Sequence, residues 1–130
     1  MFFEYVDTGS WTSSTYKSNE NDFKSIKFRQ RVARDMTGRS LNIKTLGQKV
    51  SMPIALSPIG ICGLQYANGE ILAAKAAEKM GVPFTLSTMS ICSIEDVAQN
   101  VSKPFWFQLY MMKDRVFMDG LIRRAKSAEC

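Results

Sequence analysis

The sequence of 130 residues predicts an α/β fold, the N-terminal part of a (β/α)₈ barrel. In its second half, three short apolar segments each begin at or next to a proline, and each is followed by a segment with helical periodicity and a helix start signal. Repeated strand–helix units with short connections form a parallel sheet. A hairpin predicted before the first strand can close the bottom of a barrel, and it therefore favours a barrel over a doubly wound sheet.

The N-terminal residues 1–51 are expected to form a helix followed by a hairpin. The helix is predicted from about Trp11 to Phe23. The later string SLNIKTLGQKV resembles a small hairpin with Gly47 in its turn. Residues 52–130 are then expected to hold the first three βα units, so that the whole chain is one partial barrel domain.

Three segments are predicted to be buried parallel strands: MPIALSP from Met52, VPFTLST from Val82 and KPFWFQLY from Lys103. Proline is tolerated at the first position of a strand. Because the hydrophobicity is nearly continuous rather than alternating, both faces of each strand are expected to be covered.

The first two predicted helices have clear end signals. NGEILAAKAAEKMG carries Glu70 near its start, where a carboxylate suits the helix dipole, and Gly81 as a stop. Its core stripe is expected to be Ala73, Ala76, Ala77 and Met80. The second helix begins at Ser93, with Asp96 three residues later in the pattern of a capping box.

The third predicted helix starts at Asp114, with Phe117, Leu121 and Ala125 spaced four residues apart on one face. A complete barrel of eight units takes about 250 residues. Five units are therefore expected to be absent, and the chain is expected to be a partial gene product.

Composition excludes several classes of protein. No apolar run approaches the ~18 residues that span a bilayer, and the start lacks the features of a signal peptide; a cytoplasmic location is expected. Cys62, Cys92 and Cys130 form no CxxC pair, and the sequence has no histidine, so no disulfide framework and no metal site is indicated.

A local excess of positive charge lies between Lys24 and Arg39, where six Lys or Arg residues accompany one acid, Asp35. A solvated face or a subunit contact is the favoured interpretation of such a run. Peripheral contact with an anionic membrane surface stays open. Nucleic acid is not expected as a partner, because stacking aromatics and DNA-binding motifs are lacking.

The predicted strands end in Ser57–Gly60, Ser87–Ser90 and Gln108–Tyr110. Active sites of βα barrels lie at these carboxyl ends. All three ends offer neutral hydrogen-bonding groups, and Gly60 lets a flat group approach the backbone. Such a rim suits a neutral aromatic cofactor with carbonyl and imide edges, and the glycines match no phosphate-binding fingerprint.

Consecutive strings SMPIALSPIGICG, GVPFTLSTMSICSIEDVA and KPFWFQLYMMKDR resemble the FMN-dependent α-hydroxy acid dehydrogenase and oxidase family. Two earlier strings, EYVDTGSWTSSTYKSNENDF and FRQRVARDMTGRSL, resemble its N-terminal segment. The likeness is greatest to members that oxidise L-lactate and pass electrons to the respiratory chain. It implies a (β/α)₈ TIM barrel and bound FMN.

The resemblance also implies roles for individual residues. Pro58, Ile59 and Gly60 would lie along the flavin, and Ser87 and Gln108 would hydrogen-bond its ring.

Two tyrosines would serve the substrate. Tyr110 resembles the catalytic tyrosine that contacts the substrate hydroxyl and steadies developing charge, and Tyr5 resembles the tyrosine that helps to hold the substrate carboxylate. The family's histidine base, carboxylate-binding arginines and flavin-stabilising lysine belong to segments after Cys130.

The expected function is therefore oxidation of a small L-2-hydroxy acid, with L-lactate favoured, to the 2-oxo acid, with electrons passed to a quinone or cytochrome. An oxygen-using oxidase and a non-catalytic truncated fragment are the alternatives. The full-length protein is expected to be a homo-oligomer, and attachment to the inner face of the cell membrane stays open.

Overall fold

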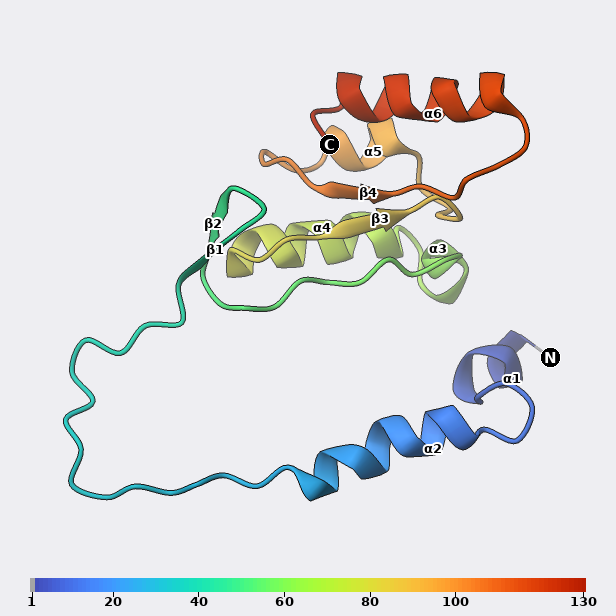
Figure 1. Ribbon diagram of the computed structural model, residues 1–130. Coiled ribbons are helices and arrows are strands. Elements are labelled where there is room, and N and C mark those ends of the chain that lie inside the picture. The colour runs from blue at the N-terminus through green and yellow to red at the C-terminus, as the bar shows by residue number, and fades with distance from the viewer. Residues whose placement is uncertain (1) are drawn as a thin grey trace. The chain divides into compact units, whose positions relative to one another are not determined.

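The computed structural model describes residues 2–130, and the chain divides into two compact units. The first unit ends at Gly38 and the second begins at Arg39. Figure 1 gives the order of their helices and strands along the chain.

The first unit contains the α-helices α1 (Phe2–Asp7) and α2 (Ser14–Asn21), and the short 3-10 helix η1 (Asp22–Ser25). The predicted single helix is therefore wrong at its start and misses α1. Trp11 and Ser13 adopt positive φ angles of 56° and 55°, which interrupt a right-handed helix before Ser14. None of the described residues of these three helices is buried.

The second unit opens with the predicted hairpin. Strands β1 (Ile43–Thr45) and β2 (Gln48–Val50) pair antiparallel. Leu46 and Gly47 between them have φ angles of 44° and 83°, the two positive values that a tight hairpin turn requires. The prediction of a hairpin with Gly47 in its turn is confirmed.

Two of the three predicted parallel strands form a regular ladder, shorter than expected. β3 (Thr85–Ser87) and β4 (Trp106–Gln108) pair parallel. The first predicted strand contributes a single parallel bridge, between Leu56 and Phe84. The expectation that both faces of this first segment are covered is wrong, because Ile54 remains 55% exposed.

The helices of the second unit are α3 (Cys62–Gln65), α4 (Gly69–Met80), α5 (Ile94–Ala98) and α6 (Arg115–Ser127). Neighbouring helices make contact in chain order, α3 with α4, α4 with α5 and α5 with α6. Figure 1 shows these helices next to the paired parallel strands β3 and β4, which lie side by side. This is the layering of consecutive βα units.

The predicted helix ends are confirmed. Gly81 closes α4 with a φ of 69°. Ser93 and Asp96 form a complete capping box at α5. Asp114 caps α6 by accepting a hydrogen bond from the backbone N–H of Phe117 at 3.0 Å.

The buried faces of two helices differ from the prediction. In α4 the buried face contains Glu70, Ala74 and Ala77, whereas Ala76 and Met80 are exposed. In α6 the Phe117 side chain is half exposed, and the buried residues are Met118, Leu121 and Ala125. Each helix is therefore turned by part of a turn relative to the stripe predicted from spacing.

The core lies between the parallel strands and these helices. Its side chains are apolar and come from strands and helices alike: Ala74, Ala77, Phe84, Leu86, Cys92, Ile94, Val97, Phe105 and Ala125. The rings of Phe84 and Phe105, at the amino ends of β3 and β4, lie 6.3 Å apart between centroids. Polar links join the helices outside this core, among them an ion pair of 2.6 Å between Glu95 and Arg124.

Within residues 2–130, no helix has the length and apolar character to cross a membrane. The same residues contain no group of His, Cys, Asp or Glu that could hold a metal ion. The three cysteines are free thiols.

Candidate functional site

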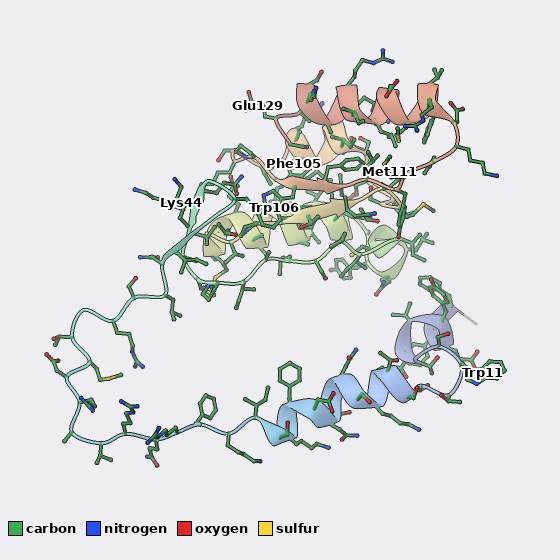
Figure 2. The ribbon with its side chains drawn as sticks, in the orientation of Figure 1. Trp11, Lys44, Phe105, Trp106, Met111 and Glu129 are labelled. Atoms are coloured by element: carbon green, nitrogen blue, oxygen red, sulfur yellow. The ribbon has the colours of Figure 1, made fainter. Side chains whose placement is uncertain are left out.

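The carboxyl ends of the parallel segments face one end of the second unit. Figure 2 labels Phe105 and Trp106 toward the amino end of β4 and Met111 just beyond its carboxyl end. The loops that follow the three segments begin at Ser57, Thr88 and Leu109. They bring most of the predicted cofactor-binding residues to this end.

Ser87 and Gln108 are joined at the ends of β3 and β4. Ser87 is 4% exposed, and its Oγ donates to Gln108 Oε1 at 3.4 Å and accepts from the backbone N–H of Met89 at 3.1 Å. The backbone N–H of Thr88 also donates to Gln108 Oε1, at 3.3 Å. The Gln108 amide nitrogen makes no hydrogen bond with residues 2–130, and so remains available as a donor.

Thr88 orients Tyr110 and was given no role from the sequence. Its Oγ1 donates to the backbone carbonyl of Gln108 and accepts from the backbone N–H of Tyr110 at 3.1 Å. The Tyr110 side chain is 52% exposed, and its hydroxyl has no hydrogen-bond partner in the described part of the chain. A hydroxyl residue at the end of a strand was the signal for this role, because such groups commonly bind a neighbouring loop.

Gly60 is not explained by the packing of the chain itself. Its φ is not positive, and a Cβ placed there would meet only the Met89 side chain, at an ordinary 3.4 Å, and the Met89 carbonyl oxygen, at 3.9 Å. By contrast, a Cβ at Gly63 would lie 2.7 Å from the Ile91 Cβ. The Gly60 backbone N–H has no hydrogen-bond partner among residues 2–130. Within the described residues, one side of the Gly60 backbone is therefore open.

The segment beside Gly60 offers apolar surface. Pro58 is exposed, and Ile59 is 53% exposed. Together with the Gln108 amide, which the buried Ser87 hydroxyl holds, the end of the second unit presents apolar contact and an uncharged hydrogen-bonding group. It can bind a flat, polar-edged ring, and it contains no histidine to act as a base.

Glu70 is the functional-site neighbour that sequence reasoning missed. It was taken for a residue that suits the helix dipole, but it is 2% exposed. Its Oε1 accepts from the backbone N–H groups of Gly63 at 3.0 Å and Ile91 at 2.9 Å. Burial acts to raise the pKa of Glu70, but these backbone hydrogen bonds hold the pKa below its ordinary value.

Cys62 and Cys92 lie near this carboxylate. Burial is the main cause that raises the pKa of both thiols, and the neighbouring Glu70 carboxylate raises the pKa of each further. Reactive cysteines need the opposite shift, toward the thiolate. Neither cysteine therefore has the electrostatic surroundings of a nucleophile.

Tyr5 belongs to the first unit, in α1. Its ring is 72% exposed and stacks with Phe2 at a centroid distance of 6.4 Å. The contacts that the structure gives for Tyr5 lie within that unit, and its role in holding a substrate carboxylate stays a prediction.

Comparison with known proteins shows consistent similarity along the chain. A family model described as FMN-dependent dehydrogenase matches residues 1–130. The L-lactate dehydrogenase of Vibrio parahaemolyticus is 52% identical over 128 residues, which cover 98% of this chain and 34% of that protein. The chain thus spans about a third of the length of the curated relatives that it matches.

Solved structures agree with the sequence matches. A soluble mutant of the membrane-associated (S)-mandelate dehydrogenase of Pseudomonas putida is 34% identical, with a TM-score of 0.89 over 98% of this chain and 36% of the other. A mandelate oxidase is 32% identical, with the same TM-score over 98% of this chain and 37% of the other. The mixed α/β structure therefore matches about a third of such proteins.

Proposed function

The chain belongs to the FMN-dependent dehydrogenase family, and from this premise we propose that it supplies the N-terminal part of a (β/α)₈ barrel enzyme that oxidises L-lactate to the 2-oxo acid. The observation that carries the proposal is the joined pair Ser87 and Gln108 beside the open backbone of Gly60. The 52% identity to an L-lactate dehydrogenase supports lactate within the class of small L-2-hydroxy acids.

The residues at the strand ends fit FMN. The rim is neutral and suits the uncharged carbonyl and imide edges of a flavin ring. It has a donor in the Gln108 amide and a Gly60 N–H that has no partner among residues 2–130. The missing Cβ at Gly60 leaves room for a flat ring against the backbone, with Pro58 and Ile59 as apolar neighbours. FMN, when bound, supplies an acceptor for two electrons.

Tyr110 and Tyr5 are proposed to serve the substrate. The Tyr110 hydroxyl, free and half exposed, would donate to the substrate oxygen and stabilise the charge that develops there. Tyr5 would donate to the substrate carboxylate. The sequence has no histidine, and the base that takes the proton from the substrate is proposed to come from the part of the relatives' length that this chain does not span.

The electron acceptor is proposed to be a quinone or cytochrome rather than oxygen. The L-lactate dehydrogenases among the relatives support this choice, whereas the similarity to a mandelate oxidase keeps the oxidase as the second candidate. Peripheral membrane contact of the assembled enzyme is consistent with the membrane-associated mandelate dehydrogenase. The exposed basic segment from Lys24 to Arg39 is a candidate surface for that contact.

The test uses a chimera in which residues 1–130 replace the matching third of the Vibrio parahaemolyticus L-lactate dehydrogenase. We expect it to bind FMN and to reduce a soluble quinone with L-lactate, with little oxygen uptake. Oxygen uptake equal to total lactate oxidation would favour the oxidase. A folded chimera without bound FMN would overturn the proposed function.

A further inference from the structure

We propose that Glu70 is a positioning residue that fixes the first two strand-end loops relative to each other and thereby shapes the flavin site. This inference rests on the proposed function, because it assigns a purpose to the loops that carry Gly60 and Ser87. Glu70 itself is not expected to touch the cofactor or the substrate. Its action passes through the backbone of Gly63 and Ile91.

The hydrogen bonds of Glu70 join segments that are far apart in the sequence. One carboxylate oxygen accepts from Gly63, three residues after Gly60, and from Ile91, two residues after Met89. A backbone hydrogen bond of 2.8 Å from Ile61 to Met89 ties the same two loops. Glu70 thus completes a link between the loops directly behind the proposed flavin contacts.

The two loops and the start of α4 pack so closely around this carboxylate that a residue larger than glycine would clash at positions 63 and 69. A Cβ at Gly63 would lie 3.0 Å from Glu70 Oε2 and 2.7 Å from the Ile91 Cβ. Next to Glu70, a Cβ at Gly69 would lie 2.9 Å from Cys62 Sγ. These glycines let the loops approach the carboxylate, so that both N–H groups reach one oxygen.

The surroundings of the carboxylate agree with a role in holding backbone. Glu70 is 2% exposed, and no Lys or Arg of residues 2–130 forms an ion pair with it. Backbone N–H groups therefore stabilise its charge, and they hold its pKa below the ordinary value against the effect of burial. The other oxygen, Oε2, has no hydrogen-bond partner among the described residues.

The same helix provides a matched control. Glu78, two turns after Glu70 in α4, also holds a loop: it accepts from the backbone N–H of Ser102 at 2.8 Å and from its Oγ at 2.6 Å. Ser102 precedes β4, whereas Gly63 and Ile91 follow the strand segments. Glu78→Ala therefore removes a comparable link at the opposite ends of the strands.

The experiment compares Glu70→Ala, Glu70→Gln, Glu70→Asp and Glu78→Ala in the chimera. FMN affinity is measured by flavin fluorescence quenching, loop order by hydrogen exchange of the Gly63 and Ile91 amides in FMN-free protein, and catalysis as separate kcat and KM. Glu70→Ala should weaken FMN binding about tenfold or more, speed both exchanges and lower kcat, because two charge-assisted hydrogen bonds are lost.

Glu70→Gln keeps an acceptor oxygen and should restore most of the FMN affinity. Glu78→Ala should leave FMN affinity and the two exchange rates at the parent values. If Glu70→Ala does not fold, Glu70→Asp decides, because its shorter side chain cannot reach both N–H groups and should also weaken FMN binding.

Unchanged FMN affinity in the folded Glu70 variants, with the parent chimera binding FMN, would overturn this inference and leave the proposed function intact. An equal loss of FMN affinity in Glu78→Ala would show that Glu70 only stabilises the fold. That result would also overturn the inference. A folded parent chimera that binds no FMN would overturn the proposed function and this inference together.

Discussion

Tyr110 is held by its backbone rather than by its side chain. Thr88 accepts its N–H at 3.1 Å, while the hydroxyl points to no partner among residues 2–130. A free hydroxyl on a fixed backbone is suited to a substrate oxygen whose charge grows during the reaction.

In the chimera, Tyr110→Phe should therefore lower kcat more than it changes KM. A hydrogen bond to a charged group contributes roughly 1.5–3 kcal/mol, which corresponds to a fall in kcat of about 10- to 150-fold. Steady-state kinetics with L-lactate and a quinone measure both constants. An unchanged kcat would contradict the proposed role of the hydroxyl.

Gly60→Ala should separate folding from cofactor binding. A methyl group at this position meets only Met89, at 3.4 Å from its Cβ and 3.9 Å from its carbonyl oxygen, so the unfolding free energy should change by less than about 0.5 kcal/mol. The same methyl group would occupy the space proposed for the flavin and should weaken FMN binding. Urea unfolding of the FMN-free chimera measures the unfolding free energy, and an FMN titration measures the cofactor affinity. Parental FMN affinity would show that no group approaches Gly60.

Single residues differ in how far the sequence could predict them. Ser87, Gln108 and Gly60 stand at strand ends, and the order of strands alone brings them to one end of the sheet. The burial of Glu70 was not predicted, because a carboxylate near a helix start is usually a surface residue that interacts favourably with the helix dipole. Its spacing to Ala74 and Ala77 on one face was the available signal, but burial of a charge depends on amide donors from loops, which local pattern does not reveal.

At the scale of helices and strands, polar end signals were more informative than apolar spacing. The capping box at Ser93, the cap at Asp114 and the stop at Gly81 involve neighbouring residues only, so the sequence determines them locally. The buried face of α6 depends on its contact with α5, which spacing alone could not place. The first strand is reduced to one bridge at Leu56, because a strand forms only where neighbouring strands supply hydrogen bonds.

Helices α5 and α6 are joined by the ion pair of Glu95 and Arg124. The hydrogen bond from Arg124, followed by the Glu95 backbone N–H, holds the pKa of Glu95 at about 2. A carboxyl group whose pKa is lowered by folding stabilises the fold above its unfolded pKa, and this stabilisation is lost as the pH falls through the folded pKa. Both side chains are nearly half exposed, so the contribution should stay below about 1 kcal/mol.

Arg124→Gln should therefore lower the unfolding free energy of the chimera by less than about 1 kcal/mol at pH 7. The difference from the parent should persist down to about pH 4.5, the ordinary Glu value, and narrow below it. Arg123→Gln is the control, because Arg123 forms no ion pair within residues 2–130. Urea unfolding across this pH range is the measurement, and equal losses in both variants would argue against the ion pair.

For the molecule as a whole, the described residues leave surfaces exposed that the proposed barrel would cover. β3 pairs with β4 on one side, and on its other side it has only the bridge at Leu56. Ile54, within the first segment, and Ile59, in the loop that follows it, are each more than half exposed. Unpaired strand edges and exposed apolar side chains favour association with other chains.

The polypeptide of residues 1–130 produced alone should therefore self-associate, retain no FMN and fail to oxidise L-lactate. The described rim offers only neutral groups to the proposed flavin ring. The sequence has no histidine base, and a positioned base alone contributes about 10²–10⁴ in rate. Light scattering during gel filtration gives the association state. Flavin absorbance after incubation with excess FMN and desalting gives the bound cofactor, and an artificial acceptor reports turnover. A stoichiometric yellow monomer that oxidises lactate would show that these 130 residues suffice for FMN binding and activity. It would contradict the expectation that the rest of the proposed barrel is needed.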